Sequence, residues 1–513
     1  MSCATDAAKS AITLVSAPGK VLVVGGYLVL DRNYSGLVVG TDASLYAAIQ
    51  EQELELPSTD NAANSDGIPI LVVSPQFTAA WWKYVFDTKT NKLVQVDSTD
   101  GSKNGFVEVV LEVSLGIVNH RSADALRRFS AQGYGQGMST GLKIILMADN
   151  DFYSQRETLA NAGLDLDSNS LRLLPRMCET GKMLKDVHKT GLGSSAAMVT
   201  SLVASVLVHF GAIASHALRP CRDSDPQGME SLQLIHNVAQ FAHCLAQGKV
   251  GSGFDVSAAV YGSHVYYRFS PSVINDAMGE SRTIAEISKA VSPENPGWNS
   301  VVRPVDIPPG FILKLADVDA GSNTPSMVKK VLHWQETHGE EARVLWNSLD
   351  AANNRIREIW AKLTVCHKKD QAEYTSVIDW CSKHKSSEWK GAPGISSSLT
   401  LALLCQLVEG IFRVRSLQRE MGENAGVPIE PPKQTELLDA CMEVPGVCMA
   451  AVPGAGGYDA IFCVALGRGP SKDVERLWSG WKSMSVGPLL ANQSSSGVCV
   501  LDSSIYPEIA AKF

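Results

Sequence analysis

The segment Gly191-Leu192-Gly193-Ser194-Ser195 stands directly before a long apolar run that predicts a helix. Its two glycines allow the backbone to turn several N–H groups toward one point. The amino end of the following helix adds partial positive charge there, and Ser194 can cap that helix. The segment therefore predicts a binding site for a polyphosphate, with the Ser195 hydroxyl as an oxygen ligand for Mg²⁺.

An ordinary helix start with a serine cap would show the same local pattern, so other motifs must decide between the two interpretations. The segment is not a Walker A loop, because no Gly-x-x-x-x-Gly-Lys-Ser/Thr occurs anywhere in the chain. Lys20 follows the pair Pro18-Gly19 between two apolar runs. A lysine fixed by such a turn can present its charge to a phosphate, although most lysines after turns are simply solvated.

Two further glycine-rich segments have more than one interpretation. Gly454 and Gly456 belong to the segment 453–457, where glycine allows a backbone to approach a ligand closely. A hairpin turn between two strands would use the same glycines. Asp255 follows the glycine turn 251–253, and it could either cap a helix or face a phosphate site.

The elements around these motifs are both strands and helices, which predicts a mixed α and β fold. The predicted strands cover residues 12–15, 21–24, 265–269, 311–315, 447–452 and 460–465. The predicted helices cover the residues after Gly193 and the ranges 231–246, 342–363 and 398–421. A tight turn is expected at 16–20. A polar stretch at 271–300 predicts a boundary between two domains, 1–300 and 301–513.

The composition limits the class of protein. A chain of 513 residues exceeds what one hydrophobic core usually supports, so at least two domains are expected. Its 45 Lys and Arg against 53 Asp and Glu give a formal charge of -8, which argues against a general binder of nucleic acid or of an anionic membrane. The 11 cysteines include no Cys-x-x-Cys pair and predict reduced thiols.

Targeting signals are not visible. The N-terminus lacks a secretory pattern, and the longest apolar run, near 196–210, is too short to span a bilayer. We therefore expect a cytoplasmic protein. The chain does not end in Ser-Lys-Leu, but other routes to the peroxisome stay open. The sequence predicts no oligomeric state.

Three segments together resemble the three motifs of the GHMP kinases, the superfamily of galactokinase, homoserine kinase, mevalonate kinase and phosphomevalonate kinase. They are residues 16–20, 189–197 and 453–457, in matching order and spacing. Within the superfamily, the strings 25–30, 246–255 and 426–432 resemble those of eukaryotic phosphomevalonate kinases most closely. The likeness runs from Ser16 to about Val464.

Two positions depart from the pattern of mevalonate kinases. Those proteins usually carry Glu where this chain has Gly26, and a proline shortly before the glycine loop where this chain has 186–189. Both departures fit the phosphomevalonate branch.

The resemblance implies a two-lobed α+β GHMP kinase fold. The N-terminal lobe would resemble domain 2 of ribosomal protein S5, and the C-terminal lobe would be ferredoxin-like. The active site would lie in the cleft between them. The implied reaction transfers the γ-phosphoryl group of ATP to (R)-5-phosphomevalonate, a small-molecule step of the mevalonate route to isopentenyl diphosphate, with ATP and Mg²⁺ as cofactors.

The resemblance also implies the site residues. Lys20, Lys189 and Asp255 would be catalytic. The nucleotide would contact Gly191, Leu192, Gly193, Ser194, Ser195 and Ala196 with its phosphates, and Ser74 and Asn104 with its adenine. The substrate would contact Lys20, Lys189, Ser252, Gly253, Ser322, Gly454 and Gly456. Ser322 is the weakest of these, because Thr324 beside it is explained sufficiently as a helix cap.

The chemistry of the acceptor refines these roles. A phosphate monoester has its second pKa near ~6, so at neutral pH it needs little help to lose a proton. Bringing two polyanions together is the harder task, and charge neutralisation should dominate. We therefore expect Lys20 and Lys189 to bridge the two phosphates, and Asp255 to orient Lys20 or to hold Mg²⁺ rather than to act as a base.

Two alternatives stay open. The chain could be another GHMP enzyme, such as mevalonate kinase or diphosphomevalonate decarboxylase. It could also be a non-catalytic sensor with this fold, although Lys20, Ser195 and Asp255 are all intact.

Overall fold

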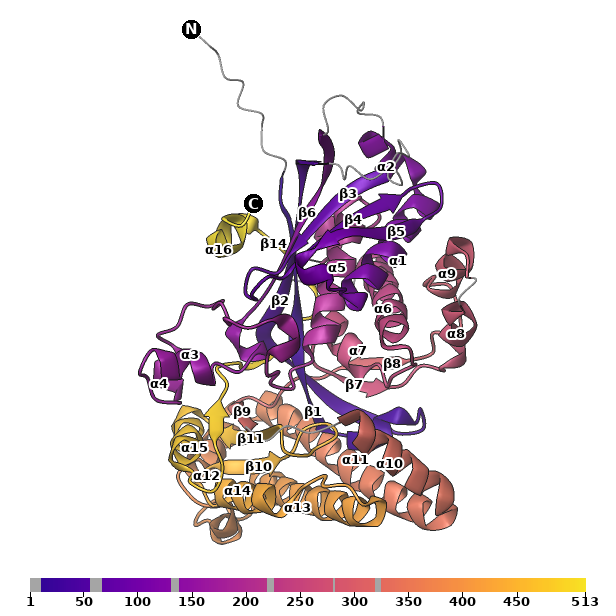
Figure 1. The fold of residues 1–513 in the computed structure, drawn as a ribbon. Coiled ribbons are helices and arrows are strands. Elements are labelled where there is room, and N and C mark those ends of the chain that lie inside the picture. The colour runs from indigo at the N-terminus through magenta and orange to yellow at the C-terminus, as the bar shows by residue number, and fades with distance from the viewer. Residues whose placement is uncertain (1–10, 56–66, 131–137, 219–225, 280–281, 319–323) are drawn as a thin grey trace.

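The computed structural model describes residues 11–55, 67–130, 138–218, 226–279, 282–318 and 324–513. The described elements form two lobes, and each lobe is built on its own sheet (Figure 1). The mixture of helices and strands agrees with the expected α+β class.

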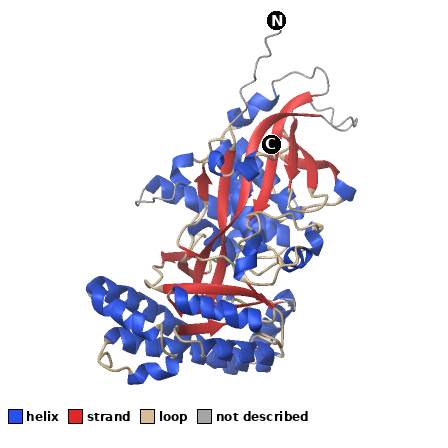
Figure 2. Ribbon diagram, turned by 90° about the vertical axis from the view of Figure 1, so that its left-hand side faces the viewer, coloured by secondary structure: helices blue, strands red, loops and turns tan. Residues whose placement is uncertain are grey.

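The first lobe contains a sheet of ten strands. Its main path is β14 (Cys499–Leu501), β1 (Thr13–Val24), β2 (Ser35–Glu55), β6 (Met138–Ala148), β3 (Gly67–Val73), β4 (Trp81–Asp87) and β5 (Lys92–Ser98). Off this path, β13 (Gln493–Ser494) and β7 (His264–Tyr267) pair with β2, and β8 (Val301–Pro304) pairs with β7. All pairings are antiparallel except β3 with β6. Figure 2 shows the long strands running down toward the second lobe.

Helices cover one face of this sheet. They are α1 (Gly105–Arg121), α5 (Ser194–His209), α6 (Pro226–Gln247) and α7 (Phe254–Tyr261). α5 packs on β1 and β2, and α1, α6 and α7 pack around α5. α5 has few charged residues because most of its side chains are buried between the sheet and the other helices. The predicted helices after Gly193 and over 231–246 are thus present, as α5 and α6.

The prediction of a tight turn at 16–20 is wrong. β1 is continuous from Thr13 to Val24, and its register against β2 shifts between Pro18 and Lys20. A local irregularity of this kind accommodates a proline within a strand, because proline has no N–H to donate. As a consequence, Lys20 projects from a strand inside the sheet rather than from the tip of a loop.

The second lobe has a four-stranded antiparallel sheet in the order β10 (Val447–Ala451), β11 (Ala460–Leu466), β9 (Phe311–Val318), β12 (Val486–Pro488). Numbered along the chain, the spatial order is 2-3-1-4 with helices between the first and second strands and between the third and fourth. This is the ferredoxin-like arrangement, as expected. The helices are α10 (Thr324–Thr337), α11 (Gly339–Lys369), α12 (Gln371–Cys381), α13 (Leu399–Ala425), α14 (Pro432–Met442) and α15 (Arg468–Gly480).

The C-terminal segment returns to the first lobe. After β12, the chain adds β13 and β14 to the first sheet, and α16 (Pro507–Ala510) follows beside them (Figure 1). The domain boundary near residue 300 stays a prediction. Within the described ranges, no helix has the length and apolar content needed to cross a membrane. The cysteines in those ranges are free thiols.

Candidate active site

The glycine loop begins α5 with a left-handed turn. Gly191 and Gly193 both have φ of 82°, a conformation that favours glycine, and Gly193 occupies the cap position. The prediction that Ser194 caps the helix is wrong, because Ser194 is already the first helical residue and no side chain caps α5. The first N–H groups of the helix therefore keep their capacity to bind an anion.

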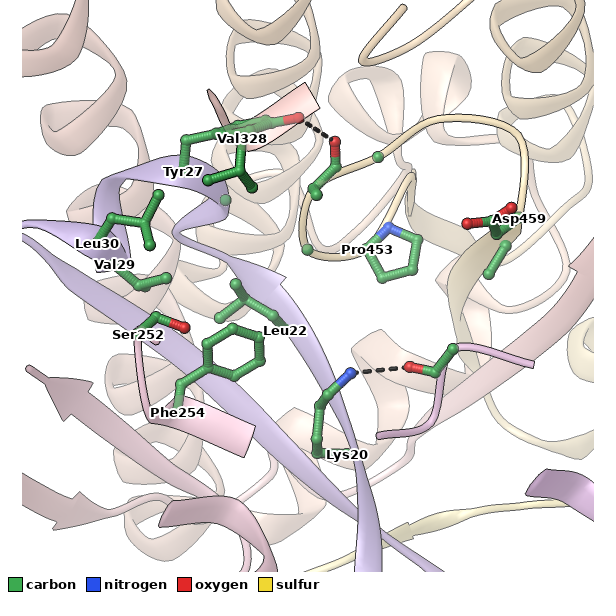
Figure 3. Close-up of a pocket in the computed structure, with 16 residues that line it drawn as sticks. Lys20, Leu22, Tyr27, Val29, Leu30, Ser252, Phe254, Val328, Pro453 and Asp459 are labelled. Carbon is green, nitrogen blue, oxygen red and sulfur yellow. Dashed lines mark hydrogen bonds between the residues drawn. The ribbon is translucent and has the colours of Figure 1, made fainter. Parts of the chain in front are cut away.

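Lys20 lies against this loop. Its backbone N–H donates to the Leu192 carbonyl at 3.0 Å, and its Nζ donates to the Gly191 carbonyl at 2.8 Å (Figure 3). Nζ also lies 5.5 Å from the centre of the Phe254 ring. Burial lowers the pKa of Lys20, and the nearby Asp255 carboxylate opposes that shift. The lysine is thus fixed beside the loop by three separate contacts.

A cavity of about 240 Å³ opens in front of Lys20, with walls from both lobes (Figure 3). We call it the acceptor cavity. Among the residues predicted for the site, its walls include Lys20, Gly191, Ser252, Gly454 and Gly456. The rest of its lining is largely apolar and comprises Leu22, Gly26, Tyr27, Val29, Leu30, Phe254, Val328, Pro453, Ala455, Asp459 and Ala460.

A second cavity, of about 90 Å³, is lined by other residues of the glycine loop, and we call it the nucleotide cavity. It is lined by the predicted residues Ser74, Asn104, Lys189, Ser194 and Ser195. Large apolar side chains complete it: Leu45, Phe77, Trp82, Phe106, Leu146, Met147, Tyr153, Leu184 and Met198, with Gln76 and Ala148. Flat and flexible apolar groups of this kind suit a planar base.

The nucleotide cavity brings together residues that are far apart in the sequence, but some of them also have local tasks. The Ser74 hydroxyl donates to the Leu146 carbonyl at 3.1 Å. The Asn104 side chain caps α1 by accepting from the Val107 N–H at 3.3 Å. Lys189 is exposed at the cavity and lies on the nucleotide side of the loop, not in the acceptor cavity.

Other predicted residues contribute through the backbone or lie elsewhere. The side chains of Leu192 and Ala196 are buried, which leaves their peptide groups for the phosphate site. Gly253 lines neither cavity; it caps α7 with φ of 82°, and a Cβ there would lie 2.8 Å from Tyr266 Oη. Asp255 lies in the first turn of α7, next to Phe254. Ser322 falls outside the described residues.

His243 is a site residue that the sequence did not reveal. It lies on α6 and is only 4% exposed, and its Nε2 is 3.1 Å from Ser195 Oγ and 3.2 Å from Gln247 Nε2. Burial lowers the pKa of His243, partly opposed by Asp255, so the neutral ring is favoured. A tautomer protonated on Nδ1 makes Nε2 the acceptor for both donors. A histidine inside an apolar helix carries no sequence signal that separates this role from simple packing.

The third motif is held by contacts with both lobes. The Tyr27 hydroxyl donates to the Ala455 carbonyl at 2.9 Å (Figure 3). The Gly454 N–H donates to the Leu22 carbonyl at 3.2 Å. The backbone also passes very close to Ile429, because a Cβ on Gly456 would lie 2.2 Å from the Ile429 carbonyl oxygen. Glycine is therefore required at 456 for packing, independently of any ligand.

Side-chain oxygens of the type that Mg²⁺ binds lie at the starts of α5 and α7. Among the described residues there is no group of three or more His, Cys, Asp or Glu that would hold a metal alone. Mg²⁺ in phosphotransferases commonly takes only one or two protein oxygens and completes its shell with phosphates and water. The Ser195 hydroxyl and the Asp255 carboxylate provide oxygens of that type, at the starts of α5 and α7.

Comparison with known proteins shows the family to which the chain belongs. Residues 406–484 match the family model for the C-terminal region of GHMP kinases. A peroxisomal phosphomevalonate kinase of Arabidopsis thaliana is 37% identical over 504 residues, covering 95% of each chain. A phosphomevalonate kinase of Aspergillus fumigatus is 36% identical over 478 residues, covering 88% of this chain and 86% of the other.

The fold has a solved counterpart. The Lin0012 protein of Listeria innocua superposes with a TM-score of 0.62 at 12% identity, covering 96% of this chain and all of the other. With the two cavities, the glycine loop and the identity to curated relatives, the chain belongs to the phosphomevalonate kinase family of the GHMP kinases.

Proposed function

We propose that the chain transfers the γ-phosphoryl group of ATP to the phosphate of (R)-5-phosphomevalonate, giving 5-diphosphomevalonate and ADP. One observation carries the proposal: a single glycine loop lines both cavities, through Gly191 on the acceptor side and through Ser194 and Ser195 on the nucleotide side. Two phosphates bound in these cavities would meet across the loop, which is the geometry that phosphoryl transfer needs.

The acceptor cavity suits the carbon skeleton of this substrate. Its apolar wall, which includes Leu22, Val29 and Val328, would pack against methyl and methylene groups. Lys20, which lines the same cavity beside the glycine loop, would receive the phosphate. An anionic head at Lys20 and a short aliphatic body against the apolar wall therefore match the lining of the cavity.

Lys20 would neutralise charge as the two phosphates approach. Its Nζ donates to the neutral Gly191 carbonyl, and a phosphate oxygen would be a stronger acceptor for the same ammonium group. Asp255 favours the charged form of Lys20, and this supports a role in orientation rather than as a base. Lys189, at the nucleotide cavity, would add a second cation to the same transition state.

Ser195 and Asp255 would hold Mg²⁺, which supplies neutralisation of the charge on the nucleotide phosphates. His243 would accept the Ser195 hydroxyl proton in a hydrogen bond and so leave the serine lone pairs free. This is the task of the buried neutral ring in the proposed mechanism.

The test is an ADP-release assay with ATP-Mg²⁺ and, in turn, mevalonate, 5-phosphomevalonate and 5-diphosphomevalonate. The proposal expects turnover with 5-phosphomevalonate alone. Turnover with mevalonate or with the diphosphate would assign the chain to another GHMP reaction. No turnover with any of the three would favour a non-catalytic sensor.

In a cell, the product would serve the mevalonate route to isopentenyl diphosphate, and we propose the cytoplasm as the location. The Arabidopsis relative is named as peroxisomal, so a fluorescent fusion in the native host would decide between the two compartments.

A further inference from the structure

Arg268 ties together two walls of the acceptor cavity. It follows β7, and its Nη1 donates to the Leu30 carbonyl, while its Nη2 donates to the carbonyls of Val250 at 3.1 Å and Gly251 at 2.7 Å. Leu30 ends the short helix η1 (Gly26–Leu30), which forms one wall of the acceptor cavity. A single guanidinium therefore connects η1 to the loop that precedes α7.

The loop that Arg268 holds leads directly to two cavity residues. Val250 and Gly251 are followed by Ser252 and Phe254, which both line the acceptor cavity. On the other wall, η1 contributes Tyr27, Val29 and Leu30. The planar guanidinium thus holds these two walls at a fixed separation, together with the Tyr266 hydroxyl that donates to the Ser252 carbonyl.

Within the described ranges, Arg268 forms no close ion pair, although the Asp31 carboxylate acts on its charge from an adjoining cavity that both residues line. Its three acceptors are neutral carbonyls, and no ion pair among the described residues includes it. Its Nε is buried without a hydrogen-bond partner, and burial lowers the pKa of Arg268. A desolvated cation of this kind costs free energy unless an anion compensates it. Arg268 thus combines a structural role, through three backbone carbonyls, with a partly buried positive charge.

The guanidinium also faces an adjoining cavity of about 320 Å³ that shares Leu30 with the acceptor cavity. Arg32 and Asp31 both line this adjoining cavity, and Arg32 Nη1 donates to the Ser270 hydroxyl at 2.6 Å. Two arginines against one aspartate give the space a positive excess, in a chain whose formal charge is -8. This positive excess would attract an anionic acceptor to the neighbouring cavity.

We propose that Arg268 is a positioning residue for the phosphomonoester acceptor. It sets the distance between η1 and the loop 250–254, and its positive charge beside the cavity favours an anion there. This inference rests on the proposed kinase reaction, since it concerns the acceptor half of that site.

The test compares Arg268→Met and Arg268→Lys with the wild type in steady-state kinetics. Arg268→Met removes the three hydrogen bonds that hold the two walls and should raise the KM for 5-phosphomevalonate about tenfold or more, because the acceptor cavity loses its fixed width. The KM for ATP should change less than about twofold. The KM of Arg268→Lys for 5-phosphomevalonate should lie between those of the wild type and Arg268→Met, because an ammonium keeps the charge but cannot reproduce the planar guanidinium.

Arg32→Met is the matched control, because it removes an equal charge from the adjoining cavity without breaking the carbonyl contacts. We expect it to leave the acceptor KM within about twofold of wild type, and an increase equal to that of Arg268→Met would overturn the positioning role. If Arg268→Met does not fold, the acceptor KM of Arg268→Lys tests the positioning role instead. An unchanged acceptor KM in the folded variant, or equal increases for acceptor and ATP, contradicts the proposal. Absence of wild-type turnover would contradict the kinase reaction instead.

Discussion

Gly193 and Lys20 approach so closely that a Cβ atom on Gly193 would lie 3.0 Å from the Cε atom of Lys20. The glycine loop and the lysine strand are therefore fitted to each other, and the left-handed backbone of Gly193 is only part of the reason for glycine there. The two motifs are 171 residues apart at the Lys20–Gly191 hydrogen bond, yet they form one phosphate-binding unit.

This contact predicts that Gly193→Ala lowers kcat by displacing the Lys20 side chain. The left-handed backbone should also cost about 1–2 kcal/mol of stability. Gly211→Ala is the matched control, because Gly211 has φ of 71° and nothing within 4 Å of its Cβ position. This variant should lose stability only through the left-handed backbone. Thermal melts should show similar losses in both variants, while kcat falls only for Gly193→Ala. Equal kcat values would mean that the contact with Lys20 is irrelevant.

Lys20→Met should lower kcat by about 100-fold or more, because it removes a cation aimed at developing charge in a partly buried site. The KM for ATP should change little, since Lys20 lines the acceptor cavity and not the nucleotide cavity. Lys249→Met serves as the control, because Lys249 is exposed and lines neither cavity. A nearly normal kcat for Lys20→Met would remove Lys20 from the mechanism.

Asp255→Asn tests whether Asp255 acts as a base. If Asp255 orients Lys20 or holds Mg²⁺, the substitution should lower kcat at every pH and leave the shape of the pH–rate profile unchanged. The measurement is kcat from pH 5.5 to 9 for both proteins. Loss of one limb of the profile in the variant alone would support proton abstraction instead.

His243→Ala should raise the Mg²⁺ concentration for half-maximal activity by about tenfold, as loss of a hydrogen bond behind a metal ligand commonly does. His243→Gln should restore part of the affinity, because its amide oxygen can accept from the Ser195 hydroxyl. Gln247→Leu removes only the second donor to His243 and should have a smaller effect. Equal Mg²⁺ curves for His243→Ala and wild type would exclude His243 from the metal site.

Local sequence accounted for the parts of the site that depend on backbone conformation. The glycines at 191 and 193 both adopt the left-handed turn that their types permit, and the apolar run after them is a buried helix. The expected ferredoxin-like order of the second sheet came from the family resemblance, since residue patterns alone do not specify which strands become neighbours.

Predictions failed where a tertiary contact outweighed a local preference. Pro18 and Gly19 favour a turn, but the residues before and after them both pair with β2, and this pairing keeps β1 continuous. Ser194 is a good cap residue, but Gly193 takes the cap position with a left-handed backbone, and Lys20 packs against it. His243 meets Ser195 across 48 residues and Arg268 meets Leu30 across 238, and no local pattern encodes such contacts.

The most direct test of the central claim is the identity of the product. Wild-type protein should be incubated with ATP-Mg²⁺ and 5-phosphomevalonate and followed by ³¹P NMR. The account predicts that the monoester signal is replaced by two coupled resonances of a diphosphate ester, in equal amount to the ADP formed. Formation of ADP and inorganic phosphate, with the monoester signal unchanged, would contradict it.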